Sequence, residues 1–142
     1  MTLSSRQQQM MDDLGIIEDS QERLGAIVDR GRKVRTLPEH DRSEANRVLG
    51  CQSQVWLTAT RQGDTCFFSG DSDSPLVKGL VLLICDFFSG EPASSILENA
   101  ETCDPIAILD LSRNLSPTRI NGLAAVRRKI RELAGTPAPD NT

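Results

Sequence analysis

Aromatic residues are scarce in this chain. Its 142 residues include four Phe, one Trp and no Tyr, so the interior must be built mostly from aliphatic side chains. The longest apolar run extends from Leu80 to Cys85, far short of the ~20 residues that a membrane-spanning helix needs. The apolar stretch of a secretory signal is also lacking. We therefore expect a soluble, cytoplasmic protein with one aliphatic core.

Metal-ligand patterns are lacking too. His40 is the single histidine, and Cys51, Cys66, Cys85 and Cys103 stand 15, 19 and 18 residues apart. A structural zinc site usually draws on ligands that are close in sequence. Disulfides are typical of small secreted domains, whereas a chain of this length can form a core without them. The sequence favours free thiols and no bound metal.

Basic residues are few in the middle of the chain. Residues 51–112 hold two basic side chains against nine acidic ones, whereas residues 113–134 hold six basic side chains against one. A basic helix could bind nucleic acid, but no aromatic side chains for base stacking accompany it. The net charge of the chain is −4. We therefore predict no nucleic-acid partner, and a solvated basic helix face.

The length predicts a single domain over residues 1–134, with a disordered tail at 135–142. Residues 54–60 and 65–69 are predicted to form a hairpin of two strands. The apolar segment 105–109 fits either a strand or a helix, and residues 35–47 form a polar connection. Caps, prolines and apolar periodicity predict helices over residues 4–14, 19–32, 75–88, 92–99 and from 117 to about 134.

Cys51 differs from the other cysteines in its local sequence. It follows Gly50, which permits a sharply turned and exposed backbone, and it precedes a predicted strand. Cys66 and Cys85 fall in a strand and in an apolar helix, which indicates core packing. Cys103 is expected to be exposed in a loop whose acids disfavour its thiolate. From the residues alone, Cys51 remains either a functional thiol or a small buried side chain.

A nucleophilic cysteine enzyme needs a base beside the thiol. His40 is the single histidine available and lies in a polar connection, so it would have to fold back onto Cys51. A small cysteine-dependent transferase or hydrolase therefore stays open as an alternative. A thiol without a base suits sulfur exchange, in which a thiolate attacks the outer sulfur of another protein's persulfide.

Three ordered segments resemble the motifs of the SufE family of sulfur acceptors, including its CsdE branch. Family members often have proline before the motif glycine, where this chain has Leu49. The resemblance covers about residues 42–134. Its segments are Gly50-Cys51-Gln52-Ser53-Gln54-Val55-Trp56-Leu57, then Gly70-Asp71-Ser72-Asp73 with Val77-Lys78-Gly79-Leu80, then Leu115-Ser116-Pro117-Thr118-Arg119 with Asn121-Gly122-Leu123.

The resemblance implies an α+β fold, SufE/IscU-like, with an antiparallel sheet of about three strands flanked by helices. It implies that Cys51 accepts persulfide sulfur from a cysteine desulfurase of the SufS or CsdA type and stimulates that enzyme. The sulfur would pass to a SufBCD-type scaffold for iron–sulfur cluster assembly. Pyridoxal phosphate belongs to the desulfurase, so no cofactor is expected here. A scaffold function, the third alternative, would call for the additional ligand cysteines of IscU-type proteins.

Supporting roles follow for residues near the motif cysteine. Gln52 and Ser53 would shape its loop and donate hydrogen bonds to sulfur. Asp71 and Asp73 would cap the helix at 75–88 and brace the cysteine loop against it. Arg119 would offer positive charge to the thiolate or the partner, or else form a surface ion pair with the acidic middle segment. A carrier also benefits from hiding its persulfide, which predicts a loop that moves on docking.

Overall fold

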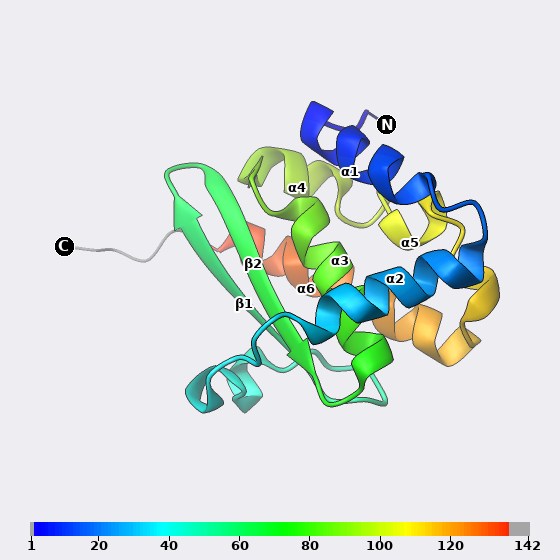
Figure 1. The fold of residues 1–142 in the computed structure, drawn as a ribbon. Coiled ribbons are helices and arrows are strands. Elements are labelled where there is room, and N and C mark those ends of the chain that lie inside the picture. Colours follow the sequence, from blue (N-terminus) through cyan, green and yellow to red (C-terminus); the bar gives the residue numbers. More distant parts are fainter. Residues whose placement is uncertain (1, 137–142) are drawn as a thin grey trace.

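The computed structural model describes residues 2–136 and has an α+β architecture, in which a hairpin and several helices surround one central helix (Figure 1). The sheet has three antiparallel strands in the order β1-β2-β3. This confirms the expected fold class. The elements are α1 (Ser5–Gly15), α2 (Ser20–Arg32), η1 (Glu39–Asp41), η2 (Glu44–Asn46), β1 (Val55–Gln62), β2 (Thr65–Ser72), α3 (Pro75–Phe88), β3 (Glu91–Pro92), α4 (Ala93–Asn99), α5 (Pro105–Ile108), η3 (Ser112–Asn114) and α6 (Pro117–Gly135).

The long helices begin where the sequence predicts, because a polar side chain satisfies a free amide group at each start. Asp19 caps α2, and Ser116 caps α6 just before Pro117. Helix α3 is capped by Ser74, whose hydroxyl oxygen accepts from the amide of Val77 at 3.4 Å. The prediction that Asp71 and Asp73 cap this helix is wrong, because Ser74 stands directly before the first turn.

The hairpin is longer than predicted. Strands β1 and β2 pair from Val55 opposite Ser72 to Gln62 opposite Thr65, around a turn in which Gly63 adopts φ +60°. Strand β3 pairs with the start of β2 and supplies the third strand that the resemblance implies. The local sequence does not locate it, because two residues carry no alternating pattern. The ambiguous segment 105–109 forms the short helix α5. Helix α6 extends through Gly135, the first residue of the predicted tail 135–142, and residues 137–142 of that tail lie outside the described residues.

Helix α3 forms the centre of the core. Ten of its 14 residues are buried, and a helix that is apolar on nearly all sides needs neighbours on all sides. The hairpin lies against one side and α2 crosses another (Figure 1), and α6 also contacts it. The covering side chains include Leu57 of β1, Ile27 of α2 and Val126 of α6. No helix that the structure describes between residues 2 and 136 has both the length and the hydropathy to cross a membrane.

The crossing of α2 and α3 depends on two glycines in contact. A Cβ atom on Gly31 would lie 2.8 Å from the Cα of Gly79, and a Cβ on Gly79 would lie 2.9 Å from the Cα of Val28. Both distances are shorter than real contacts allow, and the opposing atoms are backbone. The two helices can therefore approach this closely only without these side chains.

We expect Gly79→Ala to lower the free energy of unfolding by about 1–3 kcal/mol, because the new methyl group forces the helices apart. Urea denaturation followed by circular dichroism measures the change. Gly25→Ala in α2 is the matched control, because a Cβ there meets no atom within 4 Å; it should be neutral or stabilising by up to about 1 kcal/mol. Equal stability of the two variants would contradict the close crossing.

Candidate functional site

Cys51 lies on the loop between η2 and β1, where this loop runs along α6. Its Sγ donates a hydrogen bond to the carbonyl oxygen of Gly122 at 3.3 Å. Gly50 adopts φ +94°, and a Cβ on it would lie 3.5 Å from the Cβ of Ala125. Gly122 and Ala125 are three residues apart and so share one face of α6. Two small residues on one helix face thus let the loop approach the helix.

Hydrogen bonds hold both ends of this loop. On one side the amide of Val48 donates to the carbonyl oxygen of Val55 at 2.8 Å. On the other side the amide of Gln54 donates to Asp73 Oδ1 at 3.0 Å, and the hydroxyl of Ser72 donates to the Gln54 carbonyl oxygen at 2.7 Å. Asp73 therefore contacts the cysteine loop, as expected, although it does not cap α3. The loop is anchored where it meets the hairpin.

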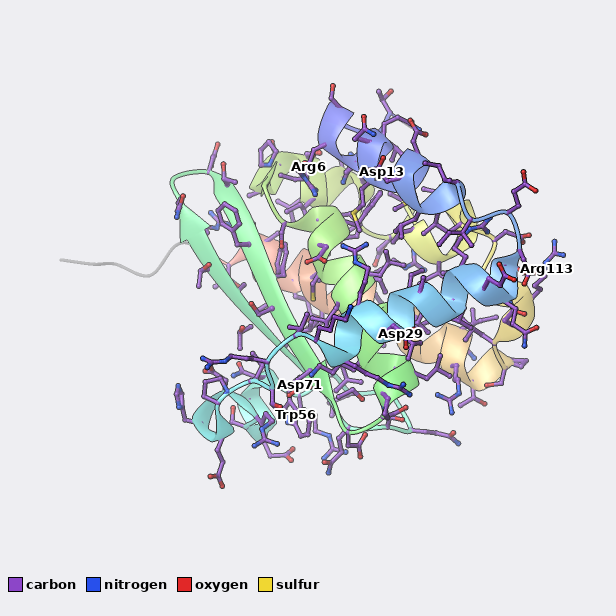
Figure 2. The ribbon with its side chains drawn as sticks, viewed as in Figure 1. Arg6, Asp13, Asp29, Trp56, Asp71 and Arg113 are labelled. Atoms are coloured by element: carbon purple, nitrogen blue, oxygen red, sulfur yellow. The ribbon has the colours of Figure 1, made fainter. Side chains whose placement is uncertain are left out.

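Asp71 occupies a different position from the one expected. Its side chain is 2% exposed and lies opposite Trp56 at the same end of the hairpin (Figure 2). Its Oδ2 accepts from the amide of Leu37 at 3.0 Å, and its Oδ1 lies 3.6 Å from Lys78 Nζ. Lys78 also donates to the carbonyl oxygen of Val34. Asp71 thus fixes the segment after α2 to the hairpin, rather than bracing the cysteine loop directly.

A pocket opens beside the Cys51 thiol, between the loop, α3 and α6. Its apolar wall comes from side chains of both helices: Val77, Leu80, Leu123 and Val126. Its polar lining comes from the motif residues Gln52, Ser53, Thr118 and Arg119. All three resembling segments therefore contribute to one site around Cys51.

Gln52, Ser53 and Arg119 line the pocket beside Cys51, but their contacts differ from the expected ones. Gln52 is exposed and Ser53 is half-buried. The expected hydrogen bonds from these residues to the sulfur are not the contact observed: the Cys51 thiol itself donates, to the carbonyl oxygen of Gly122. Arg119 is exposed and lines the pocket. Among residues 2–136 it forms no ion pair, so the surface ion pair is not observed.

Sequence reasoning missed the part that the backbone of Gly122 plays. Gly122 belongs to the third resembling segment, but its carbonyl oxygen carries no sequence signal, and only the fold brings it to the sulfur. The signal that could have found the contact is the small-residue spacing of Gly122 and Ala125 on a predicted helix, which indicates close approach by another segment.

The environment of Cys51 disfavours its thiolate. Burial raises the pKa of this thiol above its ordinary value of 9.0, and the nearby Arg128 guanidinium lowers the pKa only in part. The thiolate is the reactive form of cysteine. In the free protein the thiol is therefore mostly protonated near neutral pH, and its reactivity increases as the pH rises through the raised pKa.

The other three cysteines are buried. Cys103 is 1% exposed, so the expectation that it is exposed is wrong. The turn places Glu101 at the surface and holds Asp104 3.7 Å from Arg127, while the Cys103 side chain joins the core. Burial also raises the pKa of the Cys103 and Cys85 thiols. Cys51 is thus the one thiol with partial access to solvent.

His40 does not take part in this site. Its side chain is 80% exposed on η1, and its Nε2 lies 3.6 Å from Asp41 Oδ1. Neither the hydrogen bond of Cys51 nor the lining of its pocket includes His40. Within residues 2–136, no three His, Cys, Asp or Glu side chains come together as potential metal ligands. The described contacts of Cys51 therefore contain no histidine base.

We expect one thiol of the native protein to react with iodoacetamide, and all four to react after denaturation. The native rate should rise with pH, with a midpoint above 9.0. Arg128→Gln should slow the native reaction at pH 8 by about twofold to fivefold, because it removes the cation that favours the thiolate. Arg131→Gln is the control, since Arg131 donates to the carbonyl oxygen of Leu97 instead. A midpoint below 9.0 would contradict the buried environment.

Comparisons with known proteins agree with the fold. Among solved structures, the solution structure of a hypothetical protein from Thermus thermophilus is similar, with a TM-score of 0.74 over 94% of this chain and 96% of that chain. At 19% identity this likeness shows the fold alone. The sheet and helices described above are therefore a known arrangement.

Sequence relatives carry the comparison further. An uncharacterized SufE-like protein of Rhizobium etli is 37% identical over 132 residues, covering 89% of this chain and 87% of that protein. A second, from Rhizobium meliloti, is 34% identical over 130 residues, covering 89% and 92%. The family model for SufE, described as an Fe–S metabolism associated domain, matches residues 8–134. With this match over most of its length, the chain belongs to the SufE family of sulfur acceptors in Fe–S metabolism.

Proposed function

We propose that this protein accepts sulfur on Cys51 from a SufS-type or CsdA-type cysteine desulfurase and carries it as a persulfide. The observation that carries the proposal is the position of Cys51, a partly accessible thiol on an anchored loop where the three motif segments meet. The desulfurase holds the pyridoxal phosphate and generates the sulfur. The pocket residues of this chain position and protect the sulfur that is transferred.

The transfer balances without a further reactant. The Cys51 thiolate attacks the outer sulfur of the desulfurase persulfide, so that a new sulfur–sulfur bond forms on Cys51. The old sulfur–sulfur bond breaks, and the desulfurase cysteine leaves as a thiolate that can take up the proton from Cys51. No net oxidation occurs. Clearing the desulfurase cysteine in this way frees it for another turnover, which is how the acceptor stimulates its enzyme.

The pocket suits storage of the persulfide. A persulfide extends the side chain by one sulfur–sulfur bond of about 2.05 Å. The outer sulfur would enter the pocket, where Leu80, Leu123 and Val126 form an apolar wall. An outer sulfur exposed to solvent is easily lost to other thiols. The buried position that slows the reaction of the free thiol therefore also protects the cargo between partners.

Docking must then expose the cysteine. We propose that the desulfurase lifts Cys51 away from the Gly122 carbonyl oxygen, while Asp73 keeps the far end of the loop on the hairpin. The better-solvated thiol regains a pKa closer to its ordinary value, and Arg119 at the pocket rim offers positive charge to the thiolate. The loaded protein then passes sulfur to a SufBCD-type scaffold in the cytoplasm.

Incubation with a SufS-type desulfurase and ³⁵S-labelled cysteine should label the protein, and Cys51→Ser should take up no label. Cys103→Ala is the matched control and should keep its label, because that thiol is buried. Label is read on non-reducing gels. Label retained on Cys51→Ser would overturn the carrier function.

Turnover lost on His40→Ala would favour a cysteine–histidine enzyme instead, and iron binding by the chain alone would favour a scaffold.

Alkylation by a bulky maleimide tests the movement of the loop. With a desulfurase whose own nucleophilic cysteine is replaced by serine, the rate at Cys51 should rise severalfold, because the released thiol is better solvated and its pKa falls towards the ordinary value. Serum albumin at the same concentration is the control for crowding and should leave the rate unchanged. Equal rates with and without the desulfurase would show that docking does not release Cys51.

A further inference from the structure

A second hollow lies on the other side of the cysteine loop. It is lined by Arg47, Leu49, Ala125, Arg128, Lys129 and Glu132. Gly50 packs on Ala125 at its edge, just as Cys51 packs on Gly122 at the edge of the thiol pocket. The hollow is thus the continuation of the thiol site by about one turn along α6.

The charge of this hollow is opposite to that of the whole chain. Arg47, Arg128 and Lys129 line it against the single acidic side chain of Glu132, whereas the net charge of the protein is −4. Arg47 is paired with Glu44 at 3.3 Å. Within residues 2–136, Arg128 and Lys129 form no ion pair. Two cations beside the loop therefore keep their charge uncompensated.

Other cations of the same helix are used for packing inside the protein. Arg127 donates to the carbonyl oxygen of Glu101, and Arg131 donates to that of Leu97. These two side chains hold α6 to the segment around α4. Of the four basic residues at 127–131, Arg127 and Arg131 thus bind backbone of the protein itself, whereas Arg128 and Lys129 line the hollow.

Leu49 gives the hollow an apolar element. Its exposed fraction is 78%, although it stands directly before Gly50 and Cys51 and next to the buried Val48. A large apolar side chain held at the surface beside cations is typical of an interaction site, in which an apolar anchor is surrounded by polar contacts. In this chain the anchor belongs to the same loop as the reactive thiol.

We infer that this hollow, together with Leu49, is a docking surface for an acidic segment of the desulfurase that carries an apolar residue to contact Leu49. The inference rests on the proposed function and names where the partner binds. Charge complementarity selects an acidic segment, because the hollow holds uncompensated cations. Contact with Leu49 also acts on the loop that hides Cys51, so binding there and release of the thiol are coupled through two peptide bonds.

Titration calorimetry with the desulfurase carrying serine for its nucleophilic cysteine tests the surface. Lys129→Glu should raise Kd about tenfold and reduce its dependence on salt, because it removes an attraction and adds a repulsion. Leu49→Ser should raise Kd severalfold at every salt concentration. The matched controls are Lys33→Glu, an exposed cation after α2, and Ile16→Ser, an apolar side chain that is 77% exposed. Both controls should bind like the unaltered protein.

Two further measurements separate this inference from the proposed function. Each variant should still load sulfur onto Cys51 from a small-molecule persulfide donor at the unaltered rate, which shows that its thiol and fold are intact. Unaltered Kd values for Lys129→Glu and Leu49→Ser, with normal sulfur transfer by the unaltered protein, would overturn the docking surface alone. Failure of the unaltered protein to accept sulfur from the desulfurase would overturn both.

Discussion

Helix α3 has to be covered on every side, and the arrangement of the other elements follows from this constraint. Leu80, Val81, Ile84 and Phe87 are each 0% exposed, and complete burial of such side chains contributes roughly 1.5–3 kcal/mol each. The hairpin, α2 and α6 supply the cover (Figure 1). Because α6 and the start of α3 meet beside the hairpin, the loop that leads into β1 passes over their junction, and Cys51 arrives at the pocket between them.

The site balances protection against reactivity. The contacts that keep Cys51 half-buried, namely its hydrogen bond to Gly122 and the apolar pocket wall, also raise the pKa of its thiol. A permanently exposed cysteine would react faster as a thiolate, but a persulfide formed on it would lose its outer sulfur to other thiols. A loop anchored at the hairpin can protect the sulfur while it is closed and expose the reactive thiol while it is open. A partner must supply the free energy of opening.

Charge and apolar surface are distributed in a way that fits such a partner. Residues 51–112 hold nine acidic side chains against two basic ones, and two cations of α6, Arg128 and Lys129, flank the cysteine loop. Leu49 is exposed at the same place. The region that holds Cys51 thus combines cations with an exposed apolar side chain, the features by which the proposed acidic surface of a partner would be bound.

The sequence by itself determined the long helices and the hairpin, because these depend on residues within a few positions of one another. The interest in Cys51 came instead from three resembling segments spread over the chain, since its local sequence also fits a small buried side chain. Only the tertiary structure decided the burial of Cys103, the two-residue strand β3, the position of Asp71 and the carbonyl oxygen to which the Cys51 thiol donates. Cys51 and Gly122 are 71 residues apart, and no local pattern encodes a contact to a backbone carbonyl oxygen. The raised pKa of Cys51 has the same origin, since burial is a property of the packed fold and not of the loop sequence.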